Sequence, residues 1–282
     1  ALIWIAIFSY YPMYGLIYSL FDYYPGMDLN DSDFVGLKHF IGFFKLPDVW
    51  LILRNTVCIS LLNMTIGFIC PIILALLITE VGNSIYRRTI QTITYLPYFV
   101  SWVVVASLVF SMLGGDGLVN RLLLSWGIIE HPIGFITEGK MFWGLLLGTN
   151  IWKNVGYKSI IYVSAITGID QELYQAGKVD GLNRFGMVWH ITIPGIMPTI
   201  LLLFILGLGG ILSAGFEQQL LLGTPQTRDY YEVIDTYVYR YGIQLGNYSF
   251  ATAVGLMQSV IGLTLVIISN RISRKVTDMS IF

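Results

Sequence analysis

Long apolar segments, separated by shorter polar ones, dominate the hydrophobicity pattern of this chain. A helix needs about 20 apolar residues to cross a bilayer, because every backbone N–H and C=O must be paired within the segment. Apolar runs such as Pro71 to Thr79 do not alternate with polar residues, as the strands of a membrane barrel would. The pattern therefore predicts an all-α, polytopic membrane helix bundle of about six spans. We place these spans at residues 1–21, 53–79, 92–113, 142–166, 195–222 and 248–270.

A polar segment at residues 167–194 lies between the predicted fourth and fifth spans. It is much longer than the roughly six residues that a simple connector needs. Asp170 and Asn183 are each placed to cap the start of a short helix with a side-chain oxygen. Between them, Asp180-Gly181 is a turn signal, because glycine accepts backbone angles that other residues resist. The pattern predicts two short helices joined by a bend.

The composition supports a membrane protein. Hydrophobic residues make up 55% of the chain and charged residues 12%, against about 25% charged in soluble proteins. The formal net charge of −1 indicates no basic surface for nucleic acid. Cys58 and Cys70 both lie in the second apolar run, and we interpret them as packing groups. The first run has no methionine or basic residue ahead of it, so we interpret it as a span whose upstream segment lies outside this numbering.

Charged residues also occur inside the predicted spans, with Lys153 and Lys158 in the fourth and Glu217 in the fifth. Such charges cost about 3 kcal/mol each at mid-depth, so they normally face the bundle interior or a water-filled path. One interpretation is a polar cavity for a hydroxyl-rich substrate, and the two lysines would suit an acidic sugar. The alternative is a structural Lys–Glu pair, or a Lys158 side chain that extends to the membrane edge. The candidates for the substrate pathway are Asn150, Lys153, Tyr157, Lys158, Glu217, Gln218 and Gln219.

The polar segment contains a spaced motif. It reads Gln175-Ala176-Gly177, then Lys178-Val179-Asp180, then Gly181, and after nine further residues Ile191-Thr192-Ile193-Pro194. This spacing resembles the EAA loop of the integral membrane subunits of binding-protein-dependent ABC importers, in which Glu-Ala-Ala is followed by three residues, glycine, nine residues and Ile-x-Leu-Pro. Gln175 and Gly177 depart from that pattern. We expect Pro194 to close the segment before the next span.

A second resemblance concerns the C-terminal half of the chain. The segments are Gly215-Phe-Glu-Gln218, Gly223-Thr-Pro225, Ile234-Asp-Thr-Tyr-Val-Tyr239 and Tyr248-Ser-Phe-Ala-Thr-Ala-Val-Gly255. They are similar to stretches of carbohydrate permeases, in particular of the oligosaccharide and polysaccharide type that includes alginate importers. The resemblance covers residues 142–282, and the upstream Glu172-Leu173-Tyr174 matches what sugar-importing members show before the triplet.

The resemblance implies that residues 1–282 form a single transmembrane permease domain in the bacterial cytoplasmic (inner) membrane. It would pair with a second, different permease subunit, two ATPase subunits and an extracytoplasmic solute-binding protein, and would conduct an oligosaccharide, with an acidic one such as alginate as a candidate. The polar segment would be cytoplasmic and would dock on an ATPase subunit as a coupling helix. The implied coupling residues are Glu172, Leu173, Tyr174, Gln175, Ala176, Gly177, Asp180, Gly181 and Pro194.

The same resemblance implies that ATP and Mg²⁺ are bound by the partner ATPase, and that this chain is a transport subunit without a cofactor or metal of its own. The sequence contains no GxxxxGK[ST] phosphate loop. Lysine and arginine are divided almost equally between the two sides of the membrane, so orientation depends on the motif. Because Gln175 carries no charge where the pattern has glutamate, we expect the apolar face of Leu173, Tyr174, Ala176 and Val179 to provide the docking contacts.

Two other classes of function compete with this interpretation. An integral-membrane enzyme acting on lipid-linked substrates should cluster acidic or histidine side chains near one face, but His39, His131 and His190 lie in different segments. A secondary transporter or channel should contain inverted internal repeats, and none is evident in the sequence.

Overall fold

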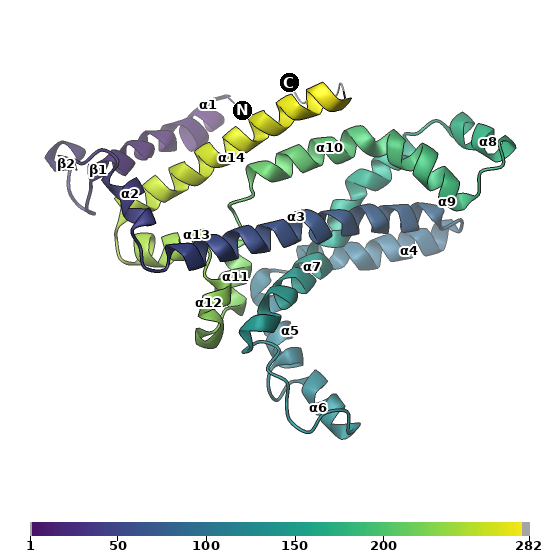
Figure 1. The fold of residues 1–282 in the computed structure, drawn as a ribbon, viewed down its shortest axis with the longest axis horizontal. Coiled ribbons are helices and arrows are strands. Elements are labelled where there is room, and N and C mark those ends of the chain that lie inside the picture. Colours follow the sequence, from purple (N-terminus) through teal and green to yellow (C-terminus); the bar gives the residue numbers. More distant parts are fainter. Residues whose placement is uncertain (1, 278–282) are drawn as a thin grey trace.

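The computed structural model describes residues 2–277, and helices make up nearly all of it (Figure 1). The α-helices are α1 Leu2–Ile5, α2 Lys38–Phe44, α3 Val49–Glu80, α4 Ser84–Tyr95, α5 Trp102–Leu113, α6 Leu118–Ser125, α7 Gly139–Thr167, α8 Gln171–Val179, α9 Arg184–Met187, α10 Ile193–Gly209, α11 Phe216–Leu222, α12 Arg228–Tyr231, α13 Ile234–Tyr237 and α14 Tyr248–Thr277. The 3₁₀ or π turns are η1 Ala6–Tyr10, η2 Tyr11–Leu20, η3 Leu29–Asp31, η4 Leu96–Phe99, η5 Val188–Thr192, η6 Pro225–Thr227 and η7 Val238–Gln244. Two strands, β1 Phe21–Asp22 and β2 Asp33–Phe34, pair antiparallel with Phe21 opposite Phe34.

The prediction of an all-α, polytopic membrane protein is confirmed. Within residues 2–277, the stretches long and apolar enough to cross a membrane are Leu2–Leu20, Val49–Glu80, Trp102–Ser125, Arg184–Gly209 and Tyr248–Lys275. The predicted fourth span, 142–166, lies within α7, whose 29 residues could also cross a bilayer. It is absent from those stretches because Asn150, Lys153, Asn154 and Lys158 make it more polar.

The predicted third span, residues 92–113, is wrong as a continuous helix. Residues 92–95 are the end of the amphipathic helix α4, and the chain is extended at Val100 and Ser101 before α5 begins. Pro97 lies at the start of the 3₁₀ turn η4, where the α-helical hydrogen bonding ends, and it has no N–H to donate. Ser101 then caps α5 by accepting the N–H of Val104 at 3.4 Å.

The predicted fifth span, residues 195–222, is also interrupted. Helix α10 ends at Gly209, and α11 begins only at Phe216. Gly215 has a φ of +92°, a left-handed conformation that glycine adopts without strain. Glu217, Gln218 and Gln219 therefore belong to a short separate helix and not to a membrane span.

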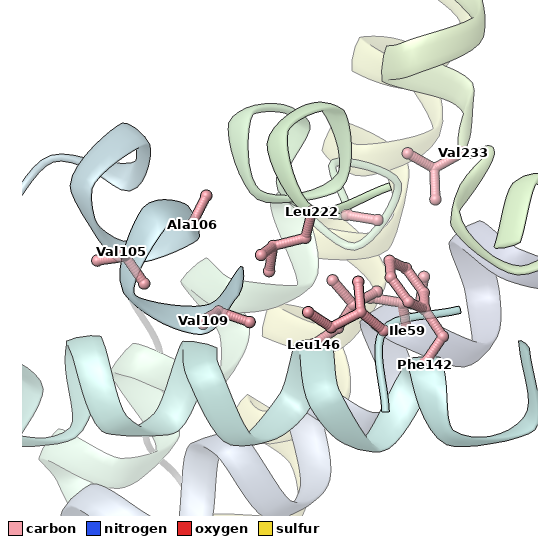
Figure 2. Packing of buried hydrophobic residues seen from close by; sticks show 10 residues of the cluster. Ile59, Val105, Ala106, Val109, Phe142, Leu146, Leu222 and Val233 are labelled. Carbon is pink, nitrogen blue, oxygen red and sulfur yellow. The ribbon is translucent and has the colours of Figure 1, made fainter. Parts of the chain in front are cut away.

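Helix α7 lies at the centre of the bundle and packs along α3, α4 and α10. Figure 2 shows Phe142 and Leu146 of α7 among Ile59 of α3, Val109 of α5 and Leu222 of α11, which are all buried. Lipid chains are as apolar as these side chains, so helix association in a membrane depends on close packing. The cluster therefore joins α5 and α11, the helices that follow the two interruptions, to one central helix.

At the end of the molecule away from α8, a group of ion pairs joins the short helices to the bundle. The Glu232 side chain is only 2% exposed and pairs with Arg240 and Arg228. Asn55 of α3 donates from Nδ2 to the carbonyl of Glu232 at 3.0 Å. Thr236 donates from Oγ1 to Glu232 Oε1 at 3.0 Å. These contacts fix α12 and α13 against α3.

Two helix pairs are in direct backbone contact through glycine. A Cβ atom at Gly156 of α7 would lie 2.0 Å from the carbonyl oxygen of Thr94 in α4. A Cβ at Gly262 of α14 would lie 2.2 Å from the carbonyl oxygen of Gly209 in α10. Since neither neighbouring atom belongs to a movable side chain, these helices can approach only where the side chain is a hydrogen.

Gly156→Ala is expected to force α4 away from α7 and to lower the free energy of unfolding by about 1–3 kcal/mol, the usual cost of overpacking. The measurement is thermal unfolding of the purified complex in detergent. Gly144→Ala on the same helix is the matched control, because a Cβ there meets no atom within 4 Å. Equal melting temperatures for the two variants would contradict the close backbone contact.

Candidate coupling segment and transmembrane cavity

The polar segment folds locally as two helices joined by a bend. Asp170 Oδ1 accepts the N–H of Glu172 at 2.9 Å and so caps α8. Asn183 Oδ1 accepts the N–H of Gly186 at 2.8 Å and caps α9. Gly181, between the helices, has a φ of +81°. The bent unit lies at the right-hand end of the molecule, beside the end of α3 and the start of α4 (Figure 1).

Helix α8 packs on the turn that precedes α10. A Cβ at Gly177 already comes within 2.8 Å of Ile191 Cδ1, and Gly177 is the buried residue of α8. The Tyr174 hydroxyl and Thr192 Oγ1 form a hydrogen bond of 3.0 Å. The third position of the triplet thus lies against a branched side chain, which favours the smallest residue there.

The prediction that Pro194 closes the segment is wrong, because the helix is continuous from Arg184 to Gly209. It passes through the π turn η5, Val188–Thr192, immediately before Pro194. Pro194 therefore lies inside a continuous helix, directly after the π turn, and has no N–H to donate. As a result, the second helix of the bend and the membrane span α10 form one rod.

Apolar side chains are exposed at this polar end of the chain. Leu173 is 53% exposed and Val179 88%, as expected for a docking face, whereas Tyr174 is directed to Thr192. Two further apolar side chains are exposed here, Phe185 at 86% and Trp189 at 70%, and neither was among the predicted docking residues. They could have been found as apolar residues within a segment otherwise rich in charge.

A cavity of about 420 Å³ lies between α3, α7, α10 and the chain at residues 210–215. Its polar lining comprises Ser60, Asn63, Asn150, Lys158 and Ser213. Ser60 Oγ and Asn63 Oδ1 are buried and have no hydrogen-bond partner within residues 2–277. Buried polar atoms are normally paired, so unpaired ones beside a cavity indicate a place for a hydrogen-bonding ligand or water.

Backbone atoms also border this cavity. Pro71 lies inside α3 and on the cavity wall, and it leaves the carbonyl of Gly67 without its helical donor. On the opposite side, Gly210 and Gly215 belong to the non-helical link between α10 and α11. Non-helical backbone at membrane depth is tolerated where it lines a cavity, and helix interruptions of this kind form substrate sites in transporters.

The structure brings together only part of the predicted substrate pathway. Asn150 and Lys158 line the cavity, whereas the other five candidates do not. Gln218 donates from Nε2 to the carbonyl of Leu146 at 2.6 Å and so fixes α11 to α7. Gln219 donates to the carbonyl of Ala214 at 2.6 Å, inside its own turn. Gln219 thus satisfies a backbone carbonyl at the helix interruption, although its Oε1 has no hydrogen-bond partner among the described residues, and Gln218 links α11 to α7.

The remaining candidates also have other surroundings. Tyr157 stacks on Tyr98 with ring centroids 3.8 Å apart. Lys153 is 7% exposed and donates to backbone carbonyls at residues 97–100. Glu217 is exposed, and none of the ion pairs among the described residues joins it to either lysine. Glu217 and Lys153 of the alternative Lys–Glu pair interact electrostatically at longer range, without a direct ion pair. The cavity-lining residues Ser60, Asn63 and Ser213 were not predicted. Ser60 and Asn63 could have been found, because they are polar residues spaced by three within the second apolar run.

Comparison with known proteins agrees with the geometry. Residues 67–278 match the family of binding-protein-dependent transport system inner membrane components. The chain is 41% identical, over 99% of its length and 87% of the relative, to the polygalacturonan/rhamnogalacturonan transport system permease protein YteP of Bacillus subtilis. It is 32% identical, over 70% of its length and 66% of the relative, to the lactose transport system permease protein LacF of Rhizobium radiobacter.

A solved structure is also similar along nearly the whole chain. A chain of the bacterial alginate ABC transporter, in complex with an alginate pentasaccharide-bound periplasmic protein, superposes with a TM-score of 0.90 at 39% identity. The superposition covers 99% of this chain and 93% of that one. With the bent segment and the helical bundle, these matches settle the class: the chain belongs to the family of binding-protein-dependent transport system inner membrane components and is a permease subunit of an ABC importer.

Proposed function

We propose that this permease conducts an oligosaccharide that contains uronic acid units, delivered by an extracytoplasmic binding protein. The observation that carries the proposal is Lys158 on the wall of the cavity. Among the described residues it has no ion-pair partner, and it lines the same cavity as Ser60 and Asn63, which have unpaired polar atoms. An ammonium group and neutral hydrogen-bonding groups together suit a carboxylate-bearing, hydroxyl-rich ligand.

The similar proteins support the same class of substrate. YteP and the alginate transporter are both named for polymers of uronic acids. The relative LacF is named for lactose, which favours a neutral disaccharide as the second candidate. The two candidates differ in charge, so the effect of Lys158 on acidic and neutral sugars separates them.

The partners that we infer are a second, different permease subunit and two ATPase subunits that bind ATP and Mg²⁺. This chain supplies a coupling segment and a part of the pathway. If α8 docks on the ATPase, closure of the ATPase pair pushes on the rod Arg184–Gly209. The same rod contributes Leu203 and Gly207 to the cavity wall, so the movement reaches the substrate without an intervening loop.

Lys158→Gln is expected to raise the KM for uptake of a galacturonate or alginate oligosaccharide about tenfold or more, since a hydrogen bond to a charged group contributes about 1.5–3 kcal/mol. Uptake of a neutral oligosaccharide of equal length should change little. The measurement is uptake into proteoliposomes that contain the full complex and its binding protein. Lys158→Arg, which keeps the charge, is the matched variant. Equal losses for acidic and neutral sugars, or no loss, would reject the uronate assignment.

Gly181→Val is expected to reduce uptake and its coupling to ATP hydrolysis, because a β-branched residue at a φ of +81° strains the bend by about 1–2 kcal/mol. Gly181→Asn is the control, since asparagine tolerates the left-handed region. No atom lies within 4 Å of a Cβ at this position, so backbone strain is the only difference expected. ATPase stimulation by the loaded binding protein and membrane insertion are measured together. Normal coupling in the valine variant would argue against a role for the bend.

A further inference from the structure

The interruption between α4 and α5 is held by a single buried cation. Lys153 of α7 donates from Nζ to the carbonyls of Pro97 at 3.4 Å and Tyr98 at 2.8 Å, and also to the carbonyl of Val100. The carbonyls of Tyr98 and Val100 lie where the turn η4 ends, whereas the carbonyl of Pro97 also accepts the N–H of Val100 at 3.2 Å. A lysine at the carbonyl end of a helix satisfies such groups and the helix dipole together.

Aromatic rings complete the surroundings of this cation. The ammonium lies 5.6 Å from the ring centroids of both Tyr98 and Trp102, within the range of cation–π attraction. Tyr98 in turn stacks on Tyr157, with the ring planes within 5° of parallel. Carbonyls and aromatic faces of the protein surround the Lys153 ammonium group. Its charge is therefore stabilised inside the protein and does not point toward a ligand.

The contacts come from one face of α7. Lys153, Gly156 and Tyr157 are spaced by three and four residues, so they lie on the same side of that helix. Gly156 is in contact with the backbone of α4 at Thr94. Lys153 and Tyr157 contact Tyr98 in the segment that follows. We name residues 96–101 the joint.

The two helices that meet at the joint have different neighbours. Helix α4 packs on α7 and α3, and its first turn is near the coupling segment, where Arg87 shares a small pocket with Tyr174 and Thr192. Helix α5 packs on α6 and on α11, which adjoins the cavity loop at residues 210–215. The joint therefore separates a half near the coupling segment from a half near the cavity.

We propose that Lys153 is a positioning residue for transport: it holds the joint on α7 so that α4 and α5 change their relative angle in a defined way when the ATPase closes. The proposal rests on the import function but not on the chemistry of the substrate. A charge that bonds backbone carbonyls can follow a small rotation of the joint, because an ammonium group has three equivalent donors on a flexible stem. Loss of the charge leaves the joint without a defined position.

The test uses Lys153→Met in the complete complex, with Lys153→Arg as the conservative variant and Lys140→Met as a control at the exposed start of α7. The maximal uptake rate of Lys153→Met should fall about fivefold or more, with an unchanged KM and equally for acidic and neutral oligosaccharides. Lys153→Arg should restore most of the rate, and Lys140→Met should behave as the parent.

A spectroscopic measurement reports on the joint directly. Spin labels are placed at Ile93 of α4 and Val103 of α5, which are 65% and 62% exposed, after Cys58 and Cys70 are replaced by alanine. In the parent complex, the distance between labels should change from one narrow distribution to another when ATP is trapped. In Lys153→Met, we expect broad distributions that differ little between the two states.

Three results would overturn the proposal. The first is a parental rate and parental label distances in Lys153→Met. The second is a raised KM for acidic sugars alone with normal distances, which would make Lys153 a substrate contact. If Lys153→Met does not assemble, Tyr157→Leu takes its place, since it removes the stacking and keeps the cation. The third result that would overturn the proposal is a parental uptake rate and parental label distances in Tyr157→Leu. Failure of the Lys158 experiment would affect none of these readings.

Discussion

Every interruption of a helix inside a membrane exposes backbone groups that lipid cannot satisfy, and this constraint explains the placement of the polar side chains in this permease. At the first interruption, the carbonyls near Tyr98 are satisfied by Lys153. At the second, Gln219 bonds the carbonyl of Ala214, and Gln218 fixes the following helix to α7. The charge and amides that are costly in a bilayer are thus retained because the broken backbone would cost more without them.

The same constraint separates the residues that support the pathway from those that are free to bind. A polar group that already bonds the backbone has little left for a ligand, as for Lys153 and Gln218. Ser60 and Asn63 are the opposite case, because their buried oxygens have no partner and border the cavity next to Lys158. A polar residue inside an apolar run can be identified from the sequence as important. Only its hydrogen-bond partners show whether it stabilises the backbone or is free to bind a ligand.

The sequence was sufficient for the fold class, the family and the local form of the bend, because these depend on apolar run length, capping residues and a left-handed glycine such as Gly181. It was not sufficient for the two interruptions. Hydropathy continues across Pro97 and across Gly210, so averaging over a span conceals them. The cavity was predicted only in part, since Asn150 and Lys158 were identified but their partners on α3 lie about ninety residues earlier. Such long-range pairing has no local signal.

One departure from the importer motif, Gly177, has a structural reason that also bears on coupling. Gly177 is buried against Ile191 and Leu182, whose side chains would have to shift to make room for a larger residue. Contact this close, with the bond between Tyr174 and Thr192, makes α8 part of the same rigid unit as α10. A rigid unit needs no specific charge at Gln175 to transmit a displacement. It needs an exposed apolar face for contact with the ATPase subunit, and Val179 and Phe185 provide such a face.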